Sequence, residues 1–174
     1  MAATVSALSP ASCHRRRQRG TTLLEALITV LVLGLAGLAY AALQVRGVSS
    51  NASAAWRSQA TVLAAEMADR MRGNPAGVAA GAYNSLTSPG TALACSLSVP
   101  CTAAQMATTD FANWRSTLAR VLPGGSGQVC RVNLGALDTD RCSTPCDASG
   151  DGFAIKVSWT EPRNSSCFFS VVQP

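Results

Sequence analysis

Residues 19–43, RGTTLLEALITVLVLGLAGLAYAAL, combine a polar start with a continuous apolar run. The 18 residues from Ala26 to Leu43 carry no charge. As a helix they would measure about 27 Å, which is enough to cross the hydrocarbon core of a membrane. The apolar core of a secretory signal peptide is shorter, roughly 7–15 residues. The stretch therefore predicts a membrane-spanning helix.

The residues before this run form a basic arm. Residues 1–20 hold four arginines and no acid, and they account for most of the net charge of +5. From Thr21 onward, 10 basic residues stand against 9 acidic ones, a net charge of +1. Because basic residues that flank a span stay in the cytoplasm, we expect a single-pass membrane protein with a cytoplasmic arm and an exported C-terminal part. The charge of that part gives nucleic-acid binding no support.

Glu25 is the ionisable group at the start of the apolar run. A carboxylate placed deep in a membrane costs up to a few kcal/mol, so such a residue is a functional candidate. The alternative is that Glu25 only reaches the lipid headgroups beside the helix N-terminus, where the helix dipole favours a negative charge.

The segment from Arg19 to Leu27 resembles the class III signal of type IV pilins and pseudopilins, with its basic leader and the apolar helix that follows. The resemblance implies that a prepilin peptidase cuts between Gly20 and Thr21 and that Thr21 is then N-methylated. It also implies that Glu25 meets the N-terminal amine of a neighbouring subunit during assembly. A buried carboxylate and a buried ammonium are each costly alone and tolerable as a pair. Thr21 stands where the family usually has phenylalanine.

Two helices are expected after the basic arm. Ser49–Arg72 is amphipathic and ends at Gly73-Asn74-Pro75, and joined to Thr21 it would form one helix of about 52 residues. Its apolar positions recur at spacings of four and three: Ala52, Trp56, Ala60, Leu63, Met67 and Met71. A capping box at Thr102 and Gln105 opens a second helix from about Ala103 to Leu122. Between the helices, Ala76–Pro100 is predicted to be a loop.

The C-terminal third predicts an antiparallel sheet. Alternating side chains indicate strands at Gln128–Leu134 and Phe153–Thr160, followed by Cys167–Val172 after a turn. The fold class is α+β, with a long N-terminal helix packed on an antiparallel sheet together with an additional helix. The three tryptophans, Trp56, Trp114 and Trp159, are expected in the core. We divide the chain into a leader (1–20), a transmembrane or assembly helix (21–48) and a periplasmic globular domain (49–174).

Cysteines outnumber what a reducing compartment favours. Cys13 lies in the basic arm, and six remain: Cys95, Cys101, Cys130, Cys142, Cys146 and Cys167. An exported location favours disulfides, and proximity favours Cys95 with Cys101. The last four allow three connectivities, among which we slightly prefer Cys130–Cys142 with Cys146–Cys167. A four-thiolate zinc site is the alternative for these four.

Catalytic signals are sparse in this sequence. The single histidine, His14, lies in the basic arm, which removes histidine-dependent acid–base chemistry from the rest of the chain. No phosphate-binding glycine loop and no nucleophile–base pair stands out, so we expect no enzyme activity and no cofactor. Four aspartates between the predicted strands are interpreted as turn formers, with calcium binding as the alternative: Asp138, Asp140, Asp147 and Asp151.

Several later segments are similar to the type IV pilus modification proteins, the PilV-type minor pilins. They are Ala64–Pro75, Gly81–Tyr83, Cys101–Asp110, Trp114–Gly125 and Val157–Glu161. The resemblance implies a pilin-like fold and a minor pilin that helps to prime or modify the pilus at the cell surface. Its implied partners are prepilin peptidase, other minor pilins, the major pilin, the inner-membrane assembly platform and membrane lipid.

Two other functions remain open at this point. The first is a minor pseudopilin of type II secretion, which would share the N-terminal signal. The second is a membrane-anchored periplasmic binding or redox module, which free thiols at Cys142 and Cys146 would support.

Overall fold

The structure is a computed structural model that describes residues 22–88, 90–96 and 98–174. The chain divides into two compact units, Met1–Gly47 and Val48–Pro174. The helix α1, Thr22–Gly73, has 52 residues and contributes to both units. Its length and its end confirm the prediction of one long helix. Residues 1–20 and Thr21, which carry the leader, the cleavage site and the methylation site, lie outside the described residues.

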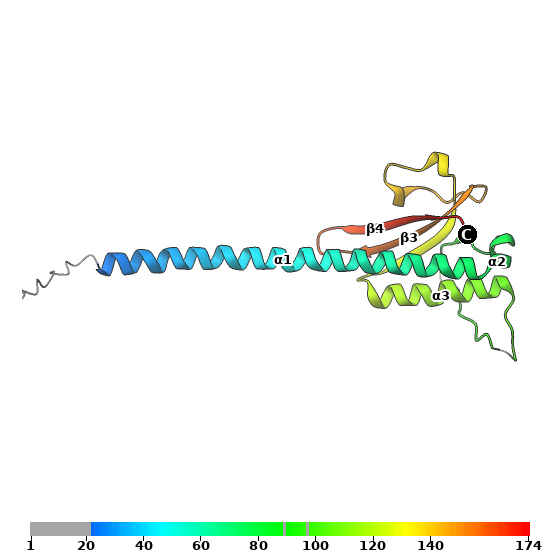
Figure 1. The fold of residues 1–174 in the computed structure, drawn as a ribbon, viewed down its shortest axis with the longest axis horizontal. Coiled ribbons are helices and arrows are strands. Elements are labelled where there is room, and N and C mark those ends of the chain that lie inside the picture. Colours follow the sequence, from blue (N-terminus) through cyan, green and yellow to red (C-terminus); the bar gives the residue numbers. More distant parts are fainter. Residues whose placement is uncertain (1–21, 89, 97) are drawn as a thin grey trace, which may run out of the picture. The chain divides into compact units, whose positions relative to one another are not determined.

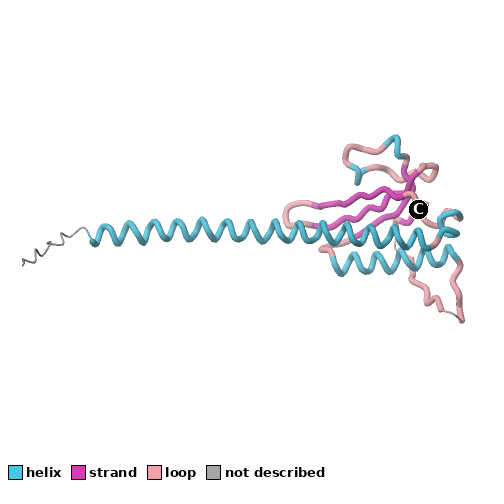
Figure 2. Tube along the Cα trace, viewed as in Figure 1, coloured by secondary structure: helices cyan, strands magenta, loops and turns pink. Residues whose placement is uncertain are grey.

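The globular unit contains a four-stranded antiparallel sheet (Figures 1 and 2). Its strand order is β1-β2-β3-β4, a simple meander. The strands are β1 (Ser85–Leu86), β2 (Ser126–Val132), β3 (Gly152–Thr160) and β4 (Ser165–Val172), and the helix α3 (Ala103–Val121) lies between the first two in sequence. The predicted α+β class and the predicted strands and helix are confirmed within a few residues.

The segment after α1 is more regular than predicted. The short helix α2, Pro75–Ala79, and strand β1 both lie in the stretch that we expected to be a loop. Asn74 accepts a hydrogen bond from the Gly77 N–H, and Pro75 suits the first turn because a helix needs no N–H donor there. The prediction of a loop is therefore wrong for these two elements.

The helix α3 and the part of α1 from residue 48 onward lie on one face of the sheet, which we call the front face (Figure 1). The main core lies between these helices and the front face. Trp114 is fully buried, and its indole N–H donates to the Leu63 carbonyl at 2.8 Å, which joins α3 to α1. Trp159 is also buried, and Trp56 packs against the same core. The prediction that the three tryptophans belong to the core is confirmed.

The back face of the sheet is covered too, by residues 133–151, which we call the cystine loop. It contains two short 3-10 turns, η1 (Leu134–Ala136) and η2 (Arg141–Ser143). Side chains from the loop and the sheet enclose a second, smaller core: Cys130, Val132 and Ala154, with Leu134, Leu137 and Phe169 packed against it. Ala154 and Lys156 of β3 lie on this face and are buried.

Three disulfides hold the globular unit. Cys95 pairs with Cys101, as proximity predicted. The other pairs are Cys130–Cys146 and Cys142–Cys167, so the preferred pairing of Cys130 with Cys142 and of Cys146 with Cys167 is wrong. The reason is that the cystine loop crosses from β2 over β3, which brings η2 to β4. Because all four of these sulfurs are in disulfides, none is left as a thiolate ligand for zinc, and Cys142 and Cys146 do not form a pair of free thiols.

Candidate assembly site

Residues 22–47 of α1 present apolar side chains around the whole circumference of the helix. Among the large apolar side chains of this segment, the exposed fraction runs from 50% at Ile28 to 76% at Leu23. In the described part of the chain, α1 is the one helix that is long and apolar enough to cross a membrane, by length and composition. A helix that is apolar on every side needs lipid or other helices around it. This segment is therefore the first candidate for a site of membrane anchoring and assembly.

Glu25 lies in the first turn of α1. The backbone N–H groups of a first turn have no partner within the helix, so this end carries a partial positive charge that favours a carboxylate. One turn later, the Thr29 hydroxyl donates to the Ala26 carbonyl, which satisfies this polar group within the helix itself. Glu25 differs from Thr29 in its possible partners, because its carboxylate can accept a hydrogen bond from a charged donor of another chain.

From residue 48 onward, polar contacts fix α1 to the rest of the globular unit. The Arg70 guanidinium lies 2.6 Å from a Glu66 carboxylate oxygen on α1 and 2.8 Å from an Asp110 oxygen on α3. These contacts raise the pKa of Arg70, chiefly through the hydrogen bond to Glu66. Sequence reasoning missed this bridge, since the i, i+4 spacing of Glu66 and Arg70 shows only half of it.

Asn74 is the buried junction between α1, α2 and α3. Its side-chain amide donates to the Tyr83 hydroxyl at 3.1 Å and to the Ala103 carbonyl at 2.8 Å, while its oxygen accepts from Gly77 at 3.0 Å. Burial raises the pKa of Tyr83. Asn74 and Tyr83 both lie in segments that carried the resemblance to minor pilins, and the structure gives them a role in holding the domain together.

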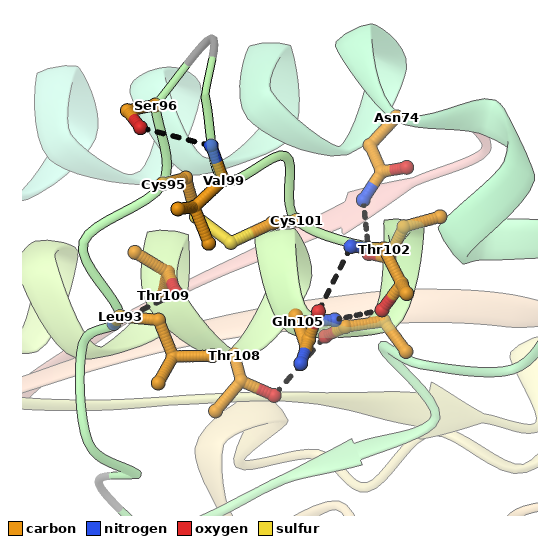
Figure 3. Close-up of a disulfide and its surroundings, with 12 residues drawn as sticks. Asn74, Leu93, Cys95, Ser96, Val99, Cys101, Thr102, Gln105, Thr108 and Thr109 are labelled. Atoms are coloured by element: carbon orange, nitrogen blue, oxygen red, sulfur yellow. Dashed lines mark hydrogen bonds between the residues drawn. A yellow bond between two sulfur atoms is a disulfide. The ribbon is translucent and has the colours of Figure 1, made fainter.

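The segment before α3 is held by the Cys95–Cys101 disulfide (Figure 3). The predicted capping box is present: the Thr102 hydroxyl accepts from the Gln105 N–H, and the Gln105 side chain accepts from the Thr102 N–H. The Leu93 N–H donates to the Thr109 hydroxyl at 3.1 Å, which ties the segment to α3.

A carboxylate at the end of the β3–β4 hairpin gathers three donors. Glu161 accepts hydrogen bonds from the Ser53 hydroxyl of α1, the Trp159 indole and the Ser166 hydroxyl. The hydrogen bond from Ser166 is the main cause that lowers the pKa of Glu161. The sequence placed Glu161 in a turn and showed no sign of this contact, because Ser53 is 108 residues away.

Two of the four aspartates of the cystine loop serve turns, as interpreted from the sequence. Asp140 caps η2 and Asp147 accepts from Ser149, and these hydrogen bonds lower the pKa of both carboxylates. Asp151 accepts from the Leu134 N–H. The Lys156 ammonium donates to the Thr144 carbonyl beneath the loop; burial lowers its pKa, and Asp138 acts in the opposite direction. Within residues 22–88, 90–96 and 98–174, no cluster of His, Cys, Asp or Glu side chains could hold a metal.

Comparison with known proteins gives one family. The model of the Tt1218-like family, described as type IV pilin Tt1218, matches residues 42–112, from α1 into α3. No curated protein and no solved structure matches the chain. Pilins are structural rather than catalytic proteins. The family match, the long apolar N-terminal helix and the antiparallel four-stranded sheet together support a membrane-anchored type IV pilin with an α+β pilin fold.

Proposed function

We propose that this protein is a PilV-type minor pilin, which takes part in the assembly or modification of a type IV pilus. It enters the filament through residues 22–47 of α1. The observation that carries the proposal is that apolar side chains are exposed on every side of this segment, while the carboxylate of Glu25 lies in its first turn. The match of residues 42–112 to a type IV pilin family supports the same function.

The proposed route begins with the leader. Prepilin peptidase cuts after Gly20 while the protein is anchored in the inner membrane, and the new N-terminus at Thr21 is methylated. The helix then leaves the lipid for a bundle of pilin helices, where Glu25 pairs with the N-terminal amine of a neighbouring subunit. Such a pair specifies how far neighbouring helices are shifted along each other, because a wrong shift would leave a charge unpaired in the apolar bundle. A buried unpaired charge costs several kcal/mol.

The globular unit provides the specific contacts in this proposal. Its partners are other minor pilins, the major pilin and the inner-membrane assembly platform. Once exported, the disulfide-bonded domain faces the periplasm and later the cell surface. A structural role of this kind uses neither a cofactor nor a catalytic residue.

The decisive experiment replaces Glu25 in the full chain with its neutral isostere. In the native host, Glu25→Gln should insert in the membrane normally, yet its amount in sheared pili should fall by more than about tenfold. Thr29→Ala is the matched control, since it removes a polar group one turn later and should leave incorporation unchanged. Normal incorporation of Glu25→Gln would contradict the proposed role of this residue.

A second measurement tests processing and separates the two filament systems. Gly20→Ala should retain the leader, which mass spectrometry of the N-terminus will detect. Deletion of the protein should impair piliation. If deletion instead stops the release of secreted proteins and leaves pili intact, the protein is a type II secretion pseudopilin.

A further inference from the structure

The two edges of the sheet differ in how well they are protected. Strand β1 has two residues, and beside it the Arg115 guanidinium donates to the carbonyls of Thr87 and Gly127, at 3.3 and 2.8 Å. Strand β4 has eight residues and forms the opposite edge. One edge is therefore short and occupied by a side chain, while the other is long.

The direction of the backbone groups on β4 follows from the ladder. The Thr160 N–H donates to the Pro123 carbonyl, so it points away from β4. Because backbone groups in an antiparallel strand alternate, the neighbouring Trp159 points toward β4, where it pairs with Ser166. The bond from the Arg131 N–H to the Asn84 carbonyl gives the same alternation in β2. The residues of β4 that direct their N–H and C=O outward are thus Ser165, Cys167, Phe169 and Val171.

These outward groups are open. In the described part of the chain, the backbone N–H groups of Cys167, Phe169 and Val171 make no hydrogen bond to any other segment. The Cys142–Cys167 disulfide holds η2 near β4. Cys167 pairs with Ser158, and both residues line a hollow on the back face of the sheet together with Cys142. The turn η2 therefore lies over the back face and leaves the outer edge of β4 uncovered. An unpaired row of this kind is complementary to another extended backbone.

The edge also lacks the usual protection against pairing. Natural sheets protect their edges with charges, prolines, bulges or short strands. The sequence of β4, SSCFFSVV, contains no charged residue and no proline, and all eight residues pair in continuous register with β3. The partner that fits is therefore an uncharged extended strand.

The direction of β4 limits which strand can pair with it. Ser53 of α1 contacts Glu161 beside the start of β4, and Arg72 lines the same small hollow as Pro174, just beyond its end. Strand β4 consequently runs in the same direction as this part of α1. Two chains with parallel α1 helices have parallel β4 strands, so an antiparallel pair of two β4 strands would reverse one helix.

We propose that the outer edge of β4 accepts an antiparallel strand from a neighbouring subunit, supplied by the β1 edge of a different pilin. This inference rests on the proposed function, which places the helices of neighbouring subunits in parallel. When the α1 helices of two neighbouring subunits are parallel, the β1 edge of one subunit runs opposite to β4 of the other. This is the direction that antiparallel pairing requires. The two-residue β1 of this chain is too short for a stable ladder, so the partner strand comes from another pilin.

Val171→Pro tests the outer backbone directly. It removes one outward N–H, while the inward bonds of Ser170 and Val172 to β3 remain. We expect an unchanged melting temperature and an incorporation into pili that falls by about tenfold, which corresponds to the loss of one well-placed contact. Val171→Thr is the matched control, since it keeps the N–H and the β-branched shape, and it should incorporate like the wild type.

A second variant protects the test against misfolding. Val171 is 40% exposed, so Val171→Lys keeps the N–H and the fold and places a charge on the edge. It should lower incorporation as well. Incorporation of both Val171→Pro and Val171→Lys at the wild-type level would overturn the inference.

Photocrosslinking identifies the occupant. A benzoylphenylalanine at position 171 of the full chain should crosslink in cells to an edge strand of another pilin, whereas the same group at Val62, which is 60% exposed on α1, should not. Crosslinks to β4 of a second copy, or to a helix, would overturn the inference. If Glu25→Gln blocks incorporation and the Val171 variants do not, the edge inference alone fails; if Glu25→Gln also incorporates normally, the proposed function fails with it.

Discussion

Residues 22–47 and residues 48–73 belong to one helix, yet only the second part buries side chains in the protein. The buried side chains of α1 lie on one stripe between Ala60 and Met71. The opposite side of this part carries charged groups such as Asp69, whereas the first part exposes apolar side chains in every direction. The distribution of apolar residues around the helix, rather than helix formation itself, therefore determines what each part packs against.

The two parts of α1 should differ most strongly in how a truncated side chain affects the core. Met67→Ala removes a fully buried side chain, and we expect it to destabilise the globular unit by about 2–5 kcal/mol. Leu31→Ala makes a comparable truncation at a residue that is 58% exposed and should leave that unit unchanged. Thermal unfolding of the full chain in detergent, followed by near-UV circular dichroism, measures both. Equal destabilisation by the two variants would abolish the distinction.

A charge should have the reverse pattern of effects. Leu35→Arg places a charge near the middle of the apolar segment, which costs about 3 kcal/mol for insertion into a membrane. Val62→Arg places the same charge on an exposed position of the second part and should change stability by less than about 0.5 kcal/mol. The fraction of protein that resists alkaline extraction from membranes reports the first effect. Full retention of Leu35→Arg would contradict the expected cost of a charge in this part of α1.

A weaker effect is expected at the contact between Glu161 and the second part of α1. Its hydrogen bonds lower the pKa of Glu161 below the ordinary value of 4.5, so the stability they contribute is present above that value. This contribution is lost as the pH falls through the lowered pKa. In melting curves between neutral pH and about pH 3, the melting temperature of the wild type should fall more steeply than that of Glu161→Gln. Parallel curves would mean that Glu161 contributes nothing to this attachment.

Local patterns in the sequence were sufficient for much of the fold. The apolar spacing predicted α1, the capping box at Thr102 and Gln105 predicted α3, and the alternation after Phe153 predicted β3. Each of these signals depends on neighbouring residues alone. For the candidate site, the same holds for Glu25, whose type and place before an apolar run are visible in the sequence.

Contacts between distant residues were not predictable in this way. Cys142 meets Cys167 only because the cystine loop crosses β3, and Glu161 meets Ser53 only because the hairpin lies beside α1. Both contacts depend on tertiary packing, which no local pattern encodes. Strand β1 was missed for a different reason, because two residues are too few to show an alternation.

The order of the disulfides has a consequence for how the domain matures. Cys130–Cys146 and Cys142–Cys167 overlap along the chain, with separations of 16 and 25 residues. An unfolded chain hardly distinguishes these pairs from the consecutive ones, since doubling a loop costs only about 0.6 kcal/mol. The sheet must therefore form before oxidation is complete, or wrong bonds must be exchanged by thiol attack. Besides oxidation, maturation of this domain accordingly depends on early formation of the sheet or on disulfide isomerisation.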